Sequence, residues 1–227
     1  AKFPAMVAAP RSSRPSAPVL VTGFDPFGGD ATNPSWELAR ALHRRQIGGH
    51  RVLAAQLPTV FGAALKRLHA LLAEHRPALV ICLGLASSRH AISIERIAIN
   101  VDDARIADNA GAQPIDTAVV AGAPAAYFSS LPIKAMREAM LDAGIPAEVS
   151  QTAGTFVCNH VFYGLMHKLA TTKSLARTRG GFIHVPPLAE QAAHGLPLDQ
   201  LVEGLRAGIR AALTVREDLR LGGGAVD

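Results

Sequence analysis

The sequence has few cysteines and few aromatic residues: two cysteines, one tryptophan and 5% aromatic residues among 227 positions. One cysteine lies inside the apolar run 79–83, so the pair does not make the disulfide framework of a small secreted protein. Apolar runs reach only strand length, short of the roughly 18 residues that a membrane helix needs. Residues 1–18 also lack the apolar segment of a signal peptide. We therefore expect a cytoplasmic protein with no membrane partner.

The sequence also has few of the features that mark nucleic-acid, nucleotide or metal binding. Its net charge is +5, but the basic residues are mostly isolated on predicted helices and few aromatic residues accompany them. Gly23, Gly28 and Gly29 do not form a dinucleotide-binding pattern. The three aspartates of 102–108 lack the spacing of a calcium loop. We expect no nucleic-acid partner, no cofactor and no metal.

Length and composition are those of one medium-sized domain. Residues 1–17 are rich in Ala, Pro, Ser and Arg and are expected to be a disordered leader, with 1–5 an expression remnant before Met6. We expect a single α/β domain over 18–217 and a flexible tail over 218–227.

Hydrophobic periodicity predicts alternating strands and helices. The predicted strands are 18–23, 51–57, 78–83, one or two pieces within 92–100, 147–151 and 181–187, and the predicted helices are 33–45, 58–76, 131–143, 158–170 and 197–215. The segments 114–125 and 171–180 are expected to be loops, the second basic and flexible. The βαβαβ order of the first half predicts a mostly parallel sheet with helices on both faces.

Cys158 is the strongest candidate for a chemical role. It lies at or near the first turn of a predicted helix, where free N–H groups and the helix dipole favour a thiolate. A thiolate is the nucleophilic form of cysteine, so this position suits a catalytic residue. The alternative is that Cys158 is a small buried hydrophobic residue, as most free cysteines are.

His184 and Glu95 are candidate partners for this cysteine. His184 lies at the end of a predicted strand, where catalytic groups of open α/β folds gather, and the alternative is a capping or core-edge histidine. Glu95 lies among isoleucines on a predicted strand, either facing solvent or orienting a histidine. Together with Cys158 they have the composition of a Cys-His-acid triad.

The loop after the first strand carries two phenylalanines, Phe24 and Phe27, beside Pro26 and a glycine pair. Exposed aromatic side chains on a loop reduce solubility unless they cover a core edge or line a pocket. A small, flat, apolar ligand group held between them is one interpretation, and packing at the edge of the core is the other.

Several motifs together resemble type I pyroglutamyl peptidases, the pyrrolidone-carboxylate peptidases. They are VTGFDPFGG at 21–29, NPSW at 33–36, ERIAIN at 95–100, DAR at 103–105, GTFVCN at 154–159 and FIHVP at 182–186. The resemblance extends from about residue 19 to residue 212 and implies a three-layer α/β/α sandwich. It also implies a homotetramer, as is usual in the bacterial members.

The resemblance assigns roles to individual residues. It implies that Cys158 is the nucleophile, His184 the base and Glu95 the acid. It implies that the pyroglutamyl ring lies between Phe24 and Phe27. The further substrate-binding positions that it implies are Thr59, Arg105, Ile106, Phe156 and Val157, with Arg105 close to the active centre.

One position departs from the family pattern. Many bacterial members read Gly-Gln-Ala-Gly-Gly-Arg after the third strand, whereas residues 84–89 read Gly-Leu-Ala-Ser-Ser-Arg. Leu85 therefore stands where those members have a glutamine near the active centre, and any polar contact of that glutamine is lost.

The function implied is that of a cysteine exopeptidase. It would remove an N-terminal pyroglutamyl (5-oxoproline) residue from peptides by thiolate attack and a thioester intermediate. Backbone N–H groups at the helix start, with help from Arg105, would hold the oxyanion. The alternatives are another thiol-dependent amidase on the same scaffold and a non-catalytic protein that binds a pyrrolidone or another small molecule.

Overall fold

The computed structural model describes residues 16–224 of the chain. Residues 1–15, which make up nearly all of the expected leader, and residues 225–227 lie outside this range. Among the described residues, no helix combines the length and the apolar character that crossing a bilayer requires.

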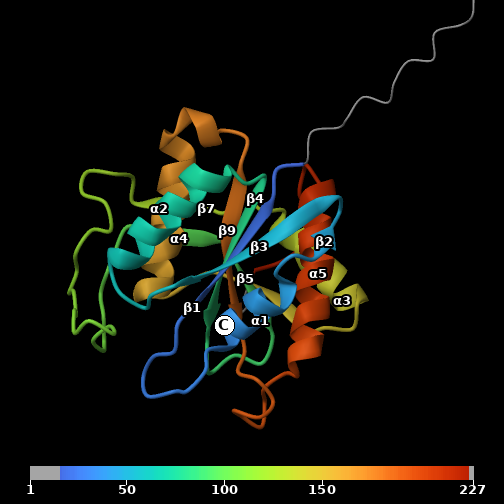
Figure 1. Cartoon of the computed structure of the whole chain (residues 1–227), viewed down its shortest axis with the longest axis horizontal. Helices are drawn as coiled ribbons and strands as arrows, with labels where there is room; N and C mark the ends of the chain where they lie inside the picture. Colours follow the sequence, from blue (N-terminus) through green and yellow to red (C-terminus); the bar gives the residue numbers. More distant parts are fainter. Residues whose placement is uncertain (1–15, 225–227) are drawn as a thin grey trace, which may run out of the picture.

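A seven-stranded sheet forms the centre of the molecule, with strands in the order β2-β3-β1-β4-β9-β5-β8 (Figure 1). The strands are β1 (Val19–Phe24), β2 (Gln46–Ile47), β3 (His50–Leu57), β4 (Leu79–Leu85), β5 (Ile92–Glu95), β8 (Ala147–Ser150) and β9 (Arg179–Val185). β1 pairs in parallel with β3 and β4, β4 with β9, and β5 with β8. The pairs β2–β3 and β5–β9 are antiparallel, so the sheet is mixed but mostly parallel, as expected.

Helices cover both faces of this sheet (Figure 1). They are α1 (Pro34–Leu42), α2 (Ala63–His75), α3 (Ile133–Asp142), α4 (Val157–Thr171) and α5 (Leu198–Thr214). One apolar core lies between the sheet and α1, α3 and α5, and a second lies between the sheet and α2 and α4. The central strands are apolar throughout because both of their faces are buried. The three-layer α/β/α sandwich is therefore confirmed.

The structure differs from the predicted elements in four main places. It adds two short strands: β2, and β7 (Ala126–Phe128), which pairs with β6 (Ile97–Ile99) in a separate two-stranded sheet. The expected loop 171–180 contains the 3-10 helix η1 (Lys173–Leu175) and the start of β9. Helix α2 begins at Ala63 rather than at 58, because contacts from other loops hold residues 59–62 in an extended turn. Such short or tertiary-dependent features leave little periodic signal in a sequence.

The segment after α5 contacts the rest of the protein. The carboxylate of Asp218 accepts hydrogen bonds from backbone N–H groups at the start of α3. The carbonyl of Gly223 accepts a hydrogen bond of 3.0 Å from Arg96. Residues 218–224 of the expected flexible tail therefore lie against α3 and the end of β8, and its last three residues lie outside the described range.

The end of β1 and the start of α1 approach each other closely at Gly23. The Phe24 N–H donates a hydrogen bond of 3.0 Å to the hydroxyl of Ser35. A Cβ atom on Gly23 would lie 2.4 Å from the backbone oxygen of Ser35, which a well-packed backbone does not accommodate. The small size of Gly23 thus sets the position of the Phe24 loop.

Substituting Gly23 by Ala is expected to lower the free energy of unfolding by about 1–3 kcal/mol, because α1 must move away from β1. Urea denaturation measures this difference. The matched control is Gly222→Ala, which adds the same methyl group where nothing lies within 4 Å. Equal stability of the two variants would contradict this account of the β1–α1 contact.

Candidate active site

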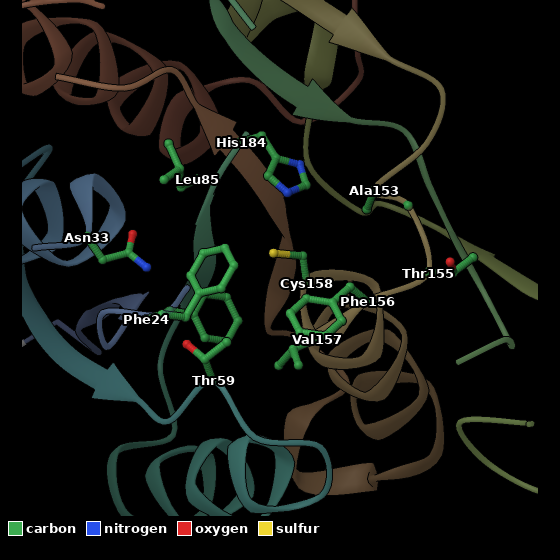
Figure 2. Close-up of a pocket in the computed structure, with 12 residues that line it drawn as sticks. Phe24, Asn33, Thr59, Leu85, Ala153, Thr155, Phe156, Val157, Cys158 and His184 are labelled. Atoms are coloured by element: carbon green, nitrogen blue, oxygen red, sulfur yellow. The ribbon is translucent and has the colours of Figure 1, made fainter. Parts of the chain in front are cut away.

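A cavity of about 200 Å³ opens where β1, β4 and β9 end, close to the start of α4 (Figure 2). Its lining is largely apolar and brings together residues far apart in the sequence. The lining residues are Phe24, Phe27, Asn33, Thr59, Leu85, Ala153, Gly154, Thr155, Phe156, Val157, Cys158 and His184. Two of the three residues predicted to form the triad, Cys158 and His184, therefore line the same cavity.

Cys158 is the second residue of α4, which begins after Phe156 without a side-chain cap. The backbone N–H groups in the first turn of a helix have no hydrogen-bond partners within the helix. In α4 these free N–H groups lie at the end of the helix that borders the cavity. The sulfur packs against β4 at Gly84, where a Cβ atom would lie only 2.8 Å from it. Figure 2 shows the sulfur pointing into the space between Cys158 and Phe24, with the imidazole of His184 above it in this view.

Glu95 holds the other side of that imidazole. In the antiparallel β5–β9 pair, Ser93 lies opposite His184, so Glu95 projects from the same face of the sheet as a diagonal neighbour. Its Oε1 atom lies 2.7 Å from Nδ1 of His184. Glu95 is 0% exposed, so the alternative of a solvent-facing strand glutamate is wrong.

Arg89 provides the positive charge beside the buried Glu95. Its Nη1 donates to the same Oε1 atom at 2.7 Å, and its Nη2 donates to the Thr152 carbonyl at 3.0 Å. The second oxygen of Glu95 has no hydrogen-bond partner among the described residues. Arg89 therefore connects the acid to the segment that leads into α4. Sequence reasoning missed this role: Arg89 matches the arginine of the family pattern at 84–89, but its contact with Glu95 depends on how the loop folds.

The pKa of the Cys158 thiol contradicts the expectation that the helix start favours a thiolate. Burial raises the pKa of Cys158 to about 12; the negative charge of Glu95 adds to this effect and that of Arg89 opposes it. The residue keeps part of its surface open to the cavity, but the sulfur itself packs against the sheet. Desolvation therefore outweighs the helix dipole, whose effect is small. The free protein carries a neutral thiol at neutral pH, and a nearby base must remove its proton.

The structure brings most of the expected substrate-binding residues together. Phe24, Phe27, Thr59, Phe156 and Val157 all line the cavity. The predicted residues Arg105 and Ile106 do not line it. Both are exposed, Ile106 by 46%. The structure therefore offers no support for an oxyanion contact from Arg105.

Several cavity residues were not predicted. Leu85 lies in the wall, as its departure from the family pattern implied, and keeps that part of the cavity apolar. Asn33 also lines the cavity, but its amide donates to the Asp25 carbonyl at 3.0 Å and its oxygen caps α1. Its helix-capping pattern was visible in the sequence, whereas its place beside the cavity depends on how α1 packs. The other unpredicted lining residues are Ala153, Gly154 and Thr155.

No group of three or more His, Cys, Asp and Glu side chains within residues 16–224 has the arrangement of a metal site. The cavity brings together the thiol of Cys158 and the imidazole of His184, which the carboxylate of Glu95 contacts. This set can abstract a proton from sulfur and return it to a leaving group.

Comparisons with known proteins agree with this geometry. Residues 17–215 match the family described as "Pyroglutamyl peptidase". A pyrrolidone-carboxylate peptidase of Cupriavidus taiwanensis is 59% identical over 211 residues, which cover 91% of this chain and 97% of that protein. The pyrrolidone-carboxylate peptidase of Erwinia tasmaniensis is 54% identical over 212 residues, 91% of this chain and 98% of that protein.

Solved structures show the same similarity. The crystal structure of pyroglutamyl peptidase I from Bacillus amyloliquefaciens aligns with a TM-score of 0.88 at 43% identity, covering 91% of this chain and 100% of that one. The pyrrolidone carboxyl peptidase of Thermococcus litoralis aligns with a TM-score of 0.87 at 36% identity, covering 91% and 99%.

The raised pKa predicts how Cys158 reacts with iodoacetamide in the free protein. Because the thiolate fraction grows with pH up to a pKa of about 12, the alkylation rate is expected to rise roughly tenfold per pH unit between about pH 7 and 10. Mass spectrometry measures the rate at Cys158, and Cys158→Ala supplies the background from Cys82. A rate that is already constant above about pH 6 would indicate a preformed thiolate instead.

Proposed function

This chain belongs to the pyroglutamyl peptidase family, and on that premise we propose that Cys158, His184 and Glu95 carry out its hydrolysis of peptides. It is a cysteine-type hydrolase that removes an N-terminal pyroglutamyl residue. The residue assignment rests on one observation. Cys158 and His184 line the same cavity, and the buried Glu95 lies 2.7 Å from Nδ1 of His184.

The cavity supports a neutral, compact ligand. Its wall is mainly apolar, with the rings of Phe24, Phe27 and Phe156 on its sides, and a lactam ring carries no charge. Free glutamate or glutamine at a peptide N-terminus would bring an ammonium group into this wall, at the cost of losing its hydration. The pyroglutamyl ring therefore binds between the phenylalanines, next to Cys158.

Catalysis begins with proton transfer because the free thiol is neutral. Glu95 accepts the Nδ1–H of His184, so Nε2 carries the lone pair and faces the cavity. As the sulfur of Cys158 attacks the carbonyl that joins pyroglutamate to the next residue, its proton passes to Nε2. The new positive charge on the imidazole lies beside the carboxylate of Glu95, which stabilises it.

The remaining steps use the same groups. Free N–H groups in the first turn of α4, including that of Cys158, hold the oxyanion of the tetrahedral intermediate. The imidazolium of His184 protonates the amine, which leaves as the shortened peptide, and a thioester remains on Cys158. His184 then removes a proton from water, which releases pyroglutamate and restores the thiol.

The peptidase domain extends over 18–217, and its partners are peptides with an N-terminal pyroglutamate. We assign the protein to the reducing cytoplasm, because a thiol nucleophile must stay reduced and both Cys82 and Cys158 are free. A homotetramer follows from the resemblance to bacterial members, and the exposed Ile115 and Phe128 are apolar side chains available for subunit contacts.

Replacing Cys158 by Ala is expected to abolish release of a fluorogenic amine from a pyroglutamyl amide, because the acyl-accepting atom is lost. The matched control is Cys82→Ala, at the other cysteine, which is buried in β4 and faces the core. This control should retain activity within about threefold. Turnover by the Cys158 variant would refute the nucleophile. A folded, reduced wild type that binds 2-pyrrolidone without cleaving the amide would identify a binding protein instead.

Removing the charge of Arg89 is expected to slow the same reaction. Arg89→Gln should lower kcat/KM by about 10- to 100-fold, the range for a hydrogen bond to a charged group. Arg89→Lys should recover part of this loss because it keeps the charge beside Glu95. The control is Arg96→Gln, since Arg96 bonds to Gln151 and Gly223 outside the cavity. Equal activity of the Arg89 and Arg96 variants would contradict this role.

A further inference from the structure

A second buried histidine, His160, lies on α4 two residues after Cys158 and bonds through both ring nitrogens. Its Nδ1 lies 2.8 Å from Oδ2 of Asp102, and its Nε2 lies 3.0 Å from the backbone nitrogen of Gly62. The Gly62 N–H is a donor, so Nε2 must supply a lone pair. The ring proton therefore sits on Nδ1 and is donated to Asp102. His160 is 6% exposed, so water does not offer alternative partners.

One of these bonds ties α4 to the loop that follows β6. The same segment is held by Asn159, the residue before His160 on the helix. The side-chain amide of Asn159 donates to the carbonyls of Ile99 and Val101, both at 2.9 Å. These hydrogen bonds from neighbouring residues of α4 hold the start of the helix and the Asp102 loop together.

The other bond connects α4 to the segment 59–62, which includes the lining residue Thr59. The carboxylates of two aspartates also hold this segment. The Thr59 N–H donates to the carboxylate of Asp25 at 2.7 Å, and the Phe61 N–H donates to that of Asp108 at 2.9 Å. The Gly62 bond to His160 is the one of these three contacts that connects the segment directly to the helix bearing Cys158.

Aromatic rings fill the space between these two sides. The ring of Phe61 meets the imidazole of His160 edge-on, with centroids 5.3 Å apart, and meets the ring of Phe156 edge-on at 5.4 Å. Phe156 lines the cavity and lies 6.2 Å from the ring of Phe27. The position of His160 is therefore transmitted through Phe61 to the aromatic wall that faces the ligand.

We propose that His160, with its proton fixed on Nδ1 by Asp102, is a positioning residue that sets the width of the cavity. It spans the distance between α4 and the segment 59–62 and thereby places Phe156 and Thr59 for the pyroglutamyl ring. This inference rests on the proposed function, because it concerns how that ring is bound.

His160 acts on binding rather than on the chemical step. It does not line the cavity and touches neither Cys158 nor His184 through a hydrogen bond in the described part of the chain. A wider cavity weakens binding of the pyroglutamyl ring by the same amount in the ground state and in the transition state. Loss of such uniform binding raises KM and leaves kcat nearly unchanged.

Two substitutions at His160 separate its two bonds. In His160→Asn the amide nitrogen takes the place of Nδ1 and keeps the bond to Asp102, but nothing accepts from Gly62. In His160→Gln the amide oxygen takes the place of Nε2 and keeps the bond from Gly62. We expect KM for a fluorogenic pyroglutamyl amide to rise roughly three- to tenfold in the Asn variant, as for one lost hydrogen bond. The rise should be smaller in the Gln variant, with kcat within about twofold in both.

Asp102 provides a second test of the same arrangement. Asp102→Asn keeps an oxygen that accepts from Nδ1, so its KM should stay close to that of the wild type. Asp102→Ala releases the ring proton and should raise KM as His160→Asn does. The matched control is His167→Asn, on the same helix, where Nδ1 lies 3.0 Å from the Tyr127 hydroxyl outside the cavity. This control should leave both KM and kcat unchanged.

The result that overturns the proposal is a KM that is the same in all variants, or a kcat that falls at constant KM. A readout independent of folding and of turnover is the tautomer of His160 in the wild type. Nitrogen-15 NMR should find the ring proton on Nδ1, and a proton on Nε2 refutes the proposal. If the wild type does not cleave the amide, the proposed function fails. The tautomer, and protection of Cys158 from iodoacetamide by 2-pyrrolidone in each variant, then still decide whether His160 sets the cavity width.

Discussion

The burial of the Glu95 carboxylate is the constraint around which the site is built. A carboxylate without solvent is unfavourable unless a cation and hydrogen-bond donors surround it. Here Arg89 and His184 converge on one of its oxygens, each at 2.7 Å. The register of β5 beside β9 places both Glu95 and His184 on one face of the sheet. The same contacts fix the imidazole and hold the segment leading to α4 through Arg89.

The burial of Cys158 itself, together with the charge of Glu95, determines the state of the thiol. Burial and the nearby negative charge raise the pKa of Cys158 to about 12, against the pull of the helix start. A resting thiolate would need its hydration or a cation beside the sulfur, and the packing of the sulfur against Gly84 provides neither. In the mechanism that we propose, the proton therefore moves to His184 only as the sulfur attacks, and Glu95 neutralises the charge that forms on the imidazole. A neutral resting cavity also suits a neutral lactam.

The protein has two buried histidine–carboxylate pairs with different consequences. In the pair of His184 and Glu95, Nε2 of the histidine is left facing a cavity and can take part in proton transfer. In the pair of His160 and Asp102, Nε2 is occupied by a backbone donor, so the ring acts as a spacer. A histidine–carboxylate pair can therefore either transfer protons or hold structural elements in place, depending on which group lies at Nε2 of the histidine.

Much of this protein was predictable from local sequence. The periodicity of the strands and helices specified a mostly parallel sheet covered on both faces, because burial on one or two faces leaves a repeat that can be read directly. The motifs around Cys158, His184 and Glu95 identified the family, and Phe24 and Phe27 were expected at the cavity that they line. The tertiary structure decided the rest. It set the state of the thiol, the partner of Glu95, the exclusion of Arg105 from the cavity and the hydrogen-bond partners of His160. Each depends on desolvation and on charges brought within a few ångströms by packing. Those distances exist only once the chain is folded, so no local pattern records them.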